Sequence, residues 1–240
     1  MPAFDTQLLR REDVAEGTAA FHFARPEGFE FKAGQSMSVT LVDPPETDAK
    51  GNTRTFSIAS APFEATIEIA TRLRDTAFKR VLAALPPDSP LRLRGPGGKF
   101  TLDEGDMRPA VFLAGGIGTT PFVSMLRQAA HDRWDRELKL FFANRRPEDA
   151  PFLTELEGLQ ERNPRFRLIA TMTDLEKSAR PWSGERGMID RALLSRHLDH
   201  LAEPVYYLAG PPAMVDALQK MLVAAGVRPA AIRTDQFFGY

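Results

Sequence analysis

The sequence predicts two domains, an N-terminal antiparallel β-barrel followed by a C-terminal α/β domain with a doubly wound parallel sheet. Three observations favour this division. A length of 240 residues suits two ordinary domains. Short apolar runs separated by Gly, Pro and Asp fill the chain up to about residue 103, whereas the later apolar runs are continuous and alternate with helical patterns. We therefore expect domains at 1–104 and 105–240.

The first domain is expected to be mostly β. Its strands are predicted at Thr18–Phe23, Ser36–Val42, Thr53–Ile58, Thr66–Thr71 and Leu91–Leu93. Short strands at this spacing are typical of a sandwich or barrel. The segment Thr76–Leu85 differs, because its apolar residues recur at the helical period and two prolines follow it.

The second domain is expected to be α/β. Unbroken apolar runs, which are typical of parallel strands covered on both faces, occur at Ala110–Ala114, Leu138–Ala143, Phe166–Thr171 and Val205–Ala209. The apolar stripe from Met214 to Leu222 indicates the buried face of a helix.

Composition excludes several classes of protein. Hydrophobic residues make up 43% and charged residues 26%, as in a globular protein with a sizeable core. The formal net charge of −1 offers no field for a nucleic-acid backbone, so nucleic acid is not an expected partner. The absence of cysteine excludes disulfides, thiol catalysis and an iron–sulfur cluster ligated within these residues.

No segment is predicted to span a membrane or to act as a secretory signal. The uncharged stretch 109–126 is long enough to consider, but glycines and Pro121 interrupt it. The N-terminus lacks the apolar region of a signal peptide. We therefore expect a cytoplasmic protein without a membrane partner; the sequence predicts no particular oligomeric state.

A glycine-rich turn lies between the predicted strand 110–114 and the helical pattern that starts near residue 122. Gly115, Gly116 and Gly118 would let the backbone approach a pyrophosphate, and the helix N-terminus offers free N–H groups. Thr119 or Thr120 can cap this helix, and Pro121 fits its first turn. A G-x-G-x-x-G fingerprint would need glycine at Pro121, so the turn is a variant. Nucleotide binding is predicted, with a purely structural turn as the alternative.

The strand 138–143 runs into Asn144, Arg145 and Arg146. Arginine at this place accommodates the 2′-phosphate of NADP, whereas an acidic residue binds the ribose of NAD. We expect NADP, although a solvated arginine pair beside Glu148 and Asp149 is the alternative reading.

In the first domain, strand alternation places Arg54 and Phe56 on one face. A cation and an aromatic ring would there meet the same ligand, with an ordinary barrel strand as the alternative. No metal site is predicted: His197 and His200 lie close in sequence but lack a third ligand.

Taken in order, these pieces resemble the ferredoxin–NADP reductase superfamily, whose members join a flavin-binding β-barrel to a nicotinamide-dinucleotide domain. The resemblance covers nearly the whole chain. The family's Arg-x-Tyr-Ser motif matches Arg54-Thr55-Phe56-Ser57, its Gly-Gly-x-Gly-x-Thr-Pro motif matches residues 115–121, and its Cys-Gly-Pro-x-x-Met element matches residues 209–214. Phe56 stands in place of the tyrosine and Ala209 in place of the cysteine.

This resemblance implies FAD and NADP, or NAD, as cofactors. Arg54 would hold the FAD pyrophosphate, Phe56 would stack on the isoalloxazine, and Ser57 would hydrogen-bond near flavin N5. Thr76 and Ala77 open the helix at which the family binds the pyrophosphate. The implied nicotinamide-nucleotide site comprises Gly115, Gly116, Gly118, Thr119, Thr120, Pro121, Asn144, Arg145, Ala209, Gly210 and Pro211.

The resemblance extends to the C-terminus. Asp235 resembles an acidic residue that some members place near the nicotinamide, and Phe237, Phe238 or Tyr240 resembles the aromatic residue that covers the flavin. Ser57, Asp235 and Tyr240 are thus the residues expected nearest the reaction.

The implied activity is hydride transfer from NADPH or NADH to bound FAD, followed by electron transfer to a separate acceptor such as a ferredoxin or an oxygenase component. Basic residues between Arg72 and Lys99 would form either a dock for that acceptor or ordinary exposed strand faces. A free-flavin reductase and a non-enzymatic electron-transfer or sensory subunit are the alternatives.

Overall fold

The structure, a computed structural model, describes residues 1–238 and divides into two compact units. Unit 1 comprises residues 1–102 and 120–128, and unit 2 comprises residues 103–119 and the chain from residue 129 onward. The chain thus passes between the units at 102/103, 119/120 and 128/129.

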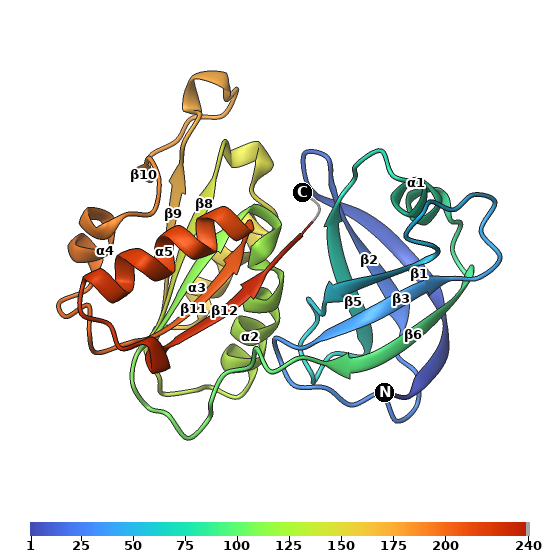
Figure 1. Ribbon diagram of the computed structural model, residues 1–240, viewed down its shortest axis with the longest axis horizontal. Coiled ribbons are helices and arrows are strands. Elements are labelled where there is room, and N and C mark those ends of the chain that lie inside the picture. Colours follow the sequence, from blue (N-terminus) through green and yellow to red (C-terminus); the bar gives the residue numbers. More distant parts are fainter. Residues whose placement is uncertain (239–240) are drawn as a thin grey trace. The chain divides into compact units, whose positions relative to one another are not determined.

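Unit 1 contains a six-stranded antiparallel sheet in the order β4-β3-β6-β1-β2-β5 (Figure 1). Its strands are β1 (Ala3–Ala15), β2 (Thr18–Ala24), β3 (Ser36–Leu41), β4 (Thr53–Ser57), β5 (Thr66–Arg72) and β6 (Pro90–Gly97). Just beyond β4, the Ala59 N–H donates to the Glu68 carbonyl oxygen of β5 at 2.7 Å. The two edge strands therefore approach each other, and the sheet curls round one core.

This core is filled by alternate residues of the strands and closed by helix α1 (Ala77–Ala84). Phe21 and Phe23 on β2 and Ile67 and Ile69 on β5 are fully buried, as alternation along a curled sheet requires. The buried face of α1 adds Phe78, as its helical spacing predicts.

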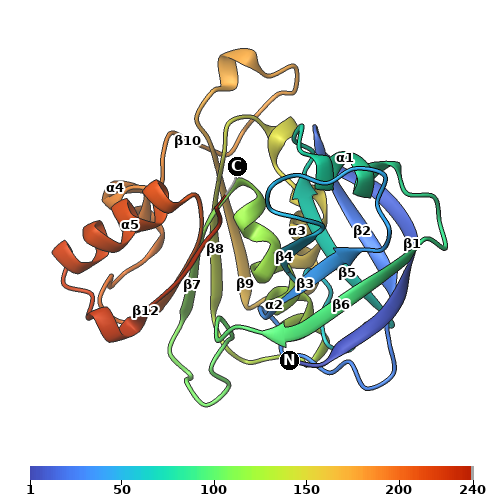
Figure 2. The ribbon, with the colours of Figure 1, turned by 45° about the vertical axis from the view of Figure 1, so that its right-hand side comes forward.

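Unit 2 contains a six-stranded parallel sheet in the order β10-β9-β8-β7-β11-β12 (Figure 2). Its strands are β7 (Ala110–Gly115), β8 (Leu138–Asn144), β9 (Phe166–Met172), β10 (Glu185–Arg186), β11 (Val205–Gly210) and β12 (Ile232–Gln236). From β7 the chain builds outward through β8, β9 and β10, and it then returns to the other side of β7 as β11. In open α/β sheets, ligands bind outside the carboxyl ends of the strands at such a switch point.

The connections of unit 2 are helical. The α-helices are α3 (Leu153–Arg162), α4 (Arg191–His197) and α5 (Pro212–Ala224), and the 3-10 turns are η1 (Gly116–Thr119), η2 (Pro147–Asp149), η3 (Leu175–Lys177) and η4 (Pro229–Ala231). Helices α4 and α5 share one core with the sheet: Leu194 of α4 and Leu218 of α5 pack with Val111, Leu113 and Leu208. Within residues 1–238, no helix has the length and apolar character needed to cross a membrane.

Helix α2 (Thr120–His131) follows η1, and its residues 120–128 belong to unit 1. Its Ser124 hydroxyl donates to the Ser60 carbonyl oxygen at 2.6 Å, and the Phe122 ring lies 5.7 Å from that of Phe100. These contacts explain why the start of this helix joins the N-terminal sheet.

The expected fold class, an antiparallel β domain followed by a parallel α/β domain, is confirmed, but three strands were not predicted: β1, β10 and β12. β1 has mostly exposed or half-buried residues and only Leu8 is fully buried, so its sequence shows no apolar run. β12 lies at the sheet edge with one buried residue, and β10 is two residues long. Strands held mainly by backbone pairing leave little trace in hydrophobic periodicity.

Candidate functional site

In unit 1, Arg54 and Phe56 lie on one face of β4, as their alternation predicts. The Arg54 guanidinium carbon lies 5.2 Å from the centre of the Phe78 ring, and the Phe56 ring lies 5.9 Å from the same ring. Phe78 comes from α1 and is 1% exposed. A buried ring thus supports both side chains from below.

The Arg54 guanidinium is held by the segment that precedes it. Nη2 donates to both carboxylate oxygens of Asp48, at 2.6 and 2.8 Å. Nη1 donates to the carbonyl oxygens of Lys50, Gly51 and Thr53, at 2.8 to 3.0 Å. Because of this contact, the pKa of Asp48 lies below its usual range. Arg54 is therefore fixed in place.

Further cations surround the start of α1. Burial, together with the nearby charges of Arg74, Arg54 and Arg72, lowers the pKa of Lys79 to about 8. Three arginines thus lie close enough to Lys79 to disfavour the positive charge on its ammonium group. A bound polyanion would relieve this repulsion, so the residues present fit a pyrophosphate.

The other predicted flavin residues lie on the same two elements. Thr76 is the N-cap of α1, and its hydroxyl accepts from the Lys79 N–H at 3.4 Å; Ala77 is buried in the first turn. Thr55 is exposed and its hydroxyl lies 3.0 Å from that of Ser38. Ser57 ends β4 and is 8% exposed.

In unit 2, two glycine turns pack directly on each other at the carboxyl ends of β7 and β11. A Cβ at Gly118 would lie 2.4 Å from the Ala209 carbonyl oxygen, and a Cβ at Gly115 would lie 2.5 Å from the Met214 sulfur. Gly116 has φ of +53°, and Gly210 has φ of +150°. Close backbone approach thus requires glycine at 118, and positive φ favours it at 116 and 210. The predicted residues 115–119 and 209–211 come together at the switch point.

Two buried polar side chains at this edge lack partners. The Thr119 hydroxyl and both amide atoms of Asn144 are buried, with no hydrogen-bond partner among residues 1–238. Buried polar groups in native proteins are ordinarily satisfied. Since both lie at the carboxyl edge of the sheet, they fit a polar ligand such as a nucleotide phosphate or ribose. Thr120 and Pro121 begin α2 directly after this turn.

The two arginines after β8 have different surroundings. Arg146 makes a paired contact with Asp149, through Nε at 2.9 Å and Nη2 at 2.8 Å. Arg145 is exposed, and no ion pair is recorded for its side chain within the described chain. Only Arg145 is therefore available to an incoming phosphate.

A hollow of about 550 Å³ opens at the carboxyl end of β9, beside β10. It is lined by Met172, Thr173, Leu175, Glu176, Arg180, Trp182, Arg186 and Gly187. The indole N–H of Trp182 donates to the Glu185 carbonyl oxygen at 2.8 Å, which fixes the ring. The hollow thus combines an aromatic ring with two cations, a lining suited to an adenine nucleotide.

At the C-terminus, Asp235 on β12 pairs in register with Ala209 on β11. Burial raises the pKa of its carboxyl group above the ordinary value. The Phe237 N–H donates to the Gly210 carbonyl oxygen at 3.0 Å, and Phe238 is 81% exposed. Tyr240 lies outside the described residues.

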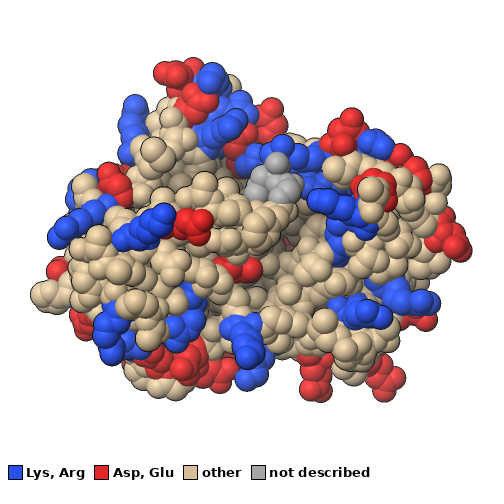
Figure 3. Space-filling model, in the orientation of Figure 1, with Lys and Arg blue, Asp and Glu red and all other residues tan. Residues whose placement is uncertain are grey.

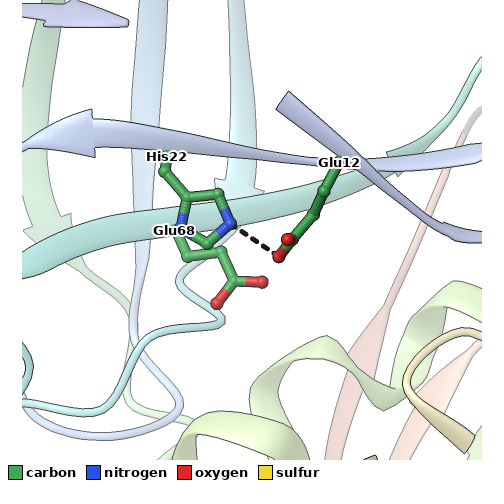
Figure 4. Close-up of side chains that lie close together, drawn as sticks. All are labelled: Glu12, His22 and Glu68. Atoms are coloured by element: carbon green, nitrogen blue, oxygen red, sulfur yellow. Dashed lines mark hydrogen bonds and ion pairs between the residues drawn. The ribbon is translucent and has the colours of Figure 1, made fainter. Parts of the chain in front are cut away.

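One cluster has the composition of a metal site. Glu12, His22 and Glu68 place ligand atoms within 4.8 Å of one another (Figure 4). Each carboxylate already has a cationic partner, Arg10 for Glu12 and Arg127 for Glu68. The two arginines thus already provide positive charge beside both carboxylates. Of the two histidines considered in the sequence, His197 hydrogen-bonds Glu185 at 2.8 Å.

Several residues of these sites were not identified from the sequence as ligand-binding residues. These residues are Asp48, Lys79, Arg180, Trp182 and Arg186, which lie in loops, on a helix or on the two-residue strand β10, and none belongs to a motif. One sequence feature could have pointed to Lys79: it belongs to the basic residues between Arg72 and Lys99, which we interpreted as a dock for the acceptor or as exposed strand faces.

Comparison with known proteins agrees with this arrangement. Residues 112–220 match the family described as oxidoreductase NAD-binding domain. The chain is 32% identical over 217 residues to ferredoxin–NADP reductase B of Sorangium cellulosum, covering 88% of this chain and 83% of that protein. It is 30% identical to the glycine betaine monooxygenase reductase subunit of Chromohalobacter salexigens, of which it spans 60%.

The fold has a solved counterpart over its whole length. A ferredoxin NADP⁺ reductase from Neisseria gonorrhoeae, solved with bound FAD and NADP, superposes with a TM-score of 0.82 at 24% identity, covering 98% of this chain and 99% of that one. The strand orders, the two glycine turns and the 32% identity over most of a reductase lead to one conclusion: this chain belongs to the ferredoxin–NADP reductase superfamily of oxidoreductases.

Proposed function

We propose that this chain is a flavoprotein reductase that takes reducing equivalents from NADPH, or NADH, through FAD and delivers them to a separate acceptor protein. The observation that carries the proposal is the cluster of Arg54, Arg72, Arg74 and Lys79 at the start of α1. Burial and repulsion by the three arginines hold the pKa of Lys79 at about 8. A dinucleotide pyrophosphate would neutralise this cluster.

In this proposal FAD binds unit 1. Arg54 and Lys79 contact the pyrophosphate with the Thr76 cap and the first N–H groups of α1, Phe56 supports the isoalloxazine, and the Ser57 hydroxyl lies near its edge. Bound FAD supplies the chemistry that joins a two-electron hydride donor to a one-electron acceptor. The residues of the chain bind and orient the reactants.

NADPH binds at the switch point of unit 2 in the same proposal. Thr119 and Asn144 gain hydrogen-bond partners there, Arg145 receives the 2′-phosphate, and the hollow beside Trp182 receives the adenosine end. Asp235 holds a proton to a higher pH than an ordinary aspartate and is proposed, with Tyr240, to act near the nicotinamide.

The acceptor is proposed to be a ferredoxin or an oxygenase component. The relatives named above include the reductase subunit of a monooxygenase, and these 240 residues contain no cysteine for a cluster of their own. Figure 3 shows basic and acidic side chains interspersed on the visible face. Arg80 pairs with Glu46 and Arg92 with Asp5, and Arg74 belongs to the pyrophosphate cluster, which leaves Arg94 and Lys99 as the exposed cations for a dock.

A salt series tests this dock. Acceptor-coupled activity should fall steeply between low and high salt, whereas reduction of a neutral dye should not change. Equal salt dependence of both reactions would argue against an electrostatic dock.

The decisive experiment for the function is a visible absorption spectrum of the purified protein, followed by anaerobic titration with NADPH and then with NADH. A two-peaked flavin spectrum that is bleached by NADPH is expected. A colourless protein that takes up no added FAD would overturn the proposal.

The same samples separate the alternatives. A protein that binds flavin weakly and turns over only with excess flavin would be a free-flavin reductase. One that turns over only with a partner would be a subunit of a larger complex. The cytoplasmic location expected from the sequence stays a prediction that cell fractionation can test.

A further inference from the structure

The Arg54 side chain, proposed above to hold the flavin pyrophosphate, is already engaged by an anion of its own chain. Both oxygens of Asp48 accept from Nη2, at 2.6 and 2.8 Å. The two side chains are only 20% and 32% exposed, so this ion pair is partly shielded from water. Charge-assisted contacts of this geometry are among the stronger hydrogen bonds in proteins.

The backbone presents the Asp48 carboxylate to Arg54. The Gly51 N–H donates to the Asp48 carbonyl oxygen at 2.8 Å, and the Lys50 N–H donates to Asp48 Oδ1 at 2.9 Å. Gly51 has φ of +70°, a conformation that glycine adopts at little cost. The carboxylate is thus built into a closed turn rather than carried on a mobile arm.

A pyrophosphate and the Asp48 carboxylate would compete for the same donor. Nη1 is committed to three carbonyl oxygens of the same segment. Among the described residues, only Nε of the guanidinium has no recorded acceptor, so a paired contact with phosphate would also need Nη2. Two anions at one Nη2 would repel each other.

We propose that Asp48 is an internal competitor for the flavin phosphate: its carboxylate occupies Arg54 when the site is empty and must give up Nη2 when the flavin pyrophosphate binds. The inference rests on the proposed FAD site. Its consequence is an affinity for FAD that is lower than the cation cluster alone would provide, and therefore a flavin that exchanges more readily.

Glu46 provides a matched comparison on the same loop. Its carboxylate pairs with Arg80, with Nε–Oε1 at 2.9 Å and Nη2–Oε2 at 2.6 Å. In the described part of the chain, no hydrogen bond or ion pair joins Glu46 to Arg54. Asp48→Asn and Glu46→Gln each remove one negative charge from this loop. Only Asp48→Asn removes the carboxylate that pairs with Arg54. The asparagine side chain keeps an oxygen that can accept from the Lys50 N–H.

The test is titration of the flavin-free protein by quenching of flavin fluorescence, using FAD and, as a ligand without phosphate, riboflavin. Asp48→Asn should bind FAD about three- to thirty-fold more tightly than the unmodified protein, the range expected for release of a partly shielded ion pair. Its affinity for riboflavin should be unchanged, and Glu46→Gln should bind both ligands as the unmodified protein does. Asp48→Ser serves as a second variant if the asparagine variant folds poorly.

Three results would overturn the inference while leaving the FAD site intact: equal or weaker FAD binding by Asp48→Asn, an equal gain for riboflavin, or an equal gain in Glu46→Gln. In the Arg54→Gln background, Asp48→Asn should give no gain in FAD affinity. Failure of the unmodified protein to bind FAD at all would instead refute the proposed function.

Discussion

At Lys79, burial and three neighbouring arginines act in the same direction on one ammonium group. They lower its pKa to about 8, so the group begins to lose its proton just above neutral pH. An anion at the cluster would raise this pKa again. Binding of FAD therefore takes up a proton at alkaline pH, which makes the affinity depend on pH.

We predict that the affinity for FAD falls as pH rises above about 8, by up to about tenfold per pH unit until the pKa of the complex is reached. Lys79→Met should bind FAD more weakly and without this pH dependence. Fluorescence titrations from pH 7 to pH 9.5 measure both. Lys99→Met, which removes an exposed lysine of the same unit, should keep the slope; loss of the slope in that variant would refute the assignment.

The two arginines after β8 should differ in their effect on cofactor binding. Arg145→Gln should raise the KM for NADPH about tenfold, because a charged hydrogen bond to the 2′-phosphate is lost, and should leave the KM for NADH unchanged. Arg146→Gln should affect both cofactors alike, since Arg146 is committed to Asp149. Steady-state kinetics with NADPH and with NADH measure these KM values. An equal rise of both KM values in Arg145→Gln would contradict a contact between Arg145 and the 2′-phosphate.

The two glycine turns of unit 2 pack on each other, a contact that the spacing of their glycines in the sequence does not predict. The glycines of 115–118 were predicted to admit a pyrophosphate. In the structure Gly118 also admits the backbone of β11, at a distance that leaves no space for a Cβ. This close approach supports the structural role of the turn, and pyrophosphate binding there stays a prediction.

We predict that Gly118→Ala lowers the free energy of unfolding by about 1 to 3 kcal/mol, the range for overpacking a closed site, and weakens NADPH binding. Gly158→Ala is the control. Gly158 lies inside α3 with nothing within 4 Å of an added Cβ, so alanine there should stabilise the protein by up to about 1 kcal/mol. Urea unfolding of the two variants should move in opposite directions, and an unchanged Gly118→Ala midpoint would contradict the packing argument.

Most elements could be predicted because their sequences carry the period of a buried face. The four unbroken runs of unit 2 became β7, β8, β9 and β11, and the helical spacing at 76–85 became α1. The charged strand β1 could not be recognised in this way: its Arg10 and Glu12 pair with each other along the strand surface, and Leu8 is its one buried residue.

The residues of the proposed flavin site likewise fall into those that local sequence could predict and those that it could not. Arg54 and Phe56 are two residues apart, so local alternation placed them on one face. Asp48 reaches Arg54 through a turn, and Lys79 approaches from another element altogether. Contacts between such distant positions depend on the folded chain and leave no local pattern in a single sequence.

At the scale of the whole chain, Arg127 of α2 forms an ion pair with Glu68 of β5, far away in sequence. Nη1 lies 2.5 Å from Glu68 Oε2, and the two side chains are 13% and 3% exposed. Breaking a buried ion pair leaves one charge without compensation, which costs far more than loss of an exposed pair.

We predict that Arg127→Met lowers the free energy of unfolding by about 3 to 5 kcal/mol. Arg92→Met, which breaks the exposed contact with Asp5, should cost no more than about 1 kcal/mol. In the double variant Glu68→Gln/Arg127→Met, part of the loss should be recovered because no buried charge remains. Denaturant unfolding of the set provides the comparison, and equal losses in Arg127→Met and Arg92→Met would refute it.

The passage of residues 120–128 into unit 1 bears on how such proteins can be recombined. A chimaera joined near residue 104 would combine the sheet of one parent with the α2 of another, and so would separate Glu68 from the arginine that neutralises it. Grafting residues 120–128 together with residues 1–102 keeps that pair intact. The natural unit of exchange between relatives is therefore discontinuous in sequence, although each half resembles a self-contained module.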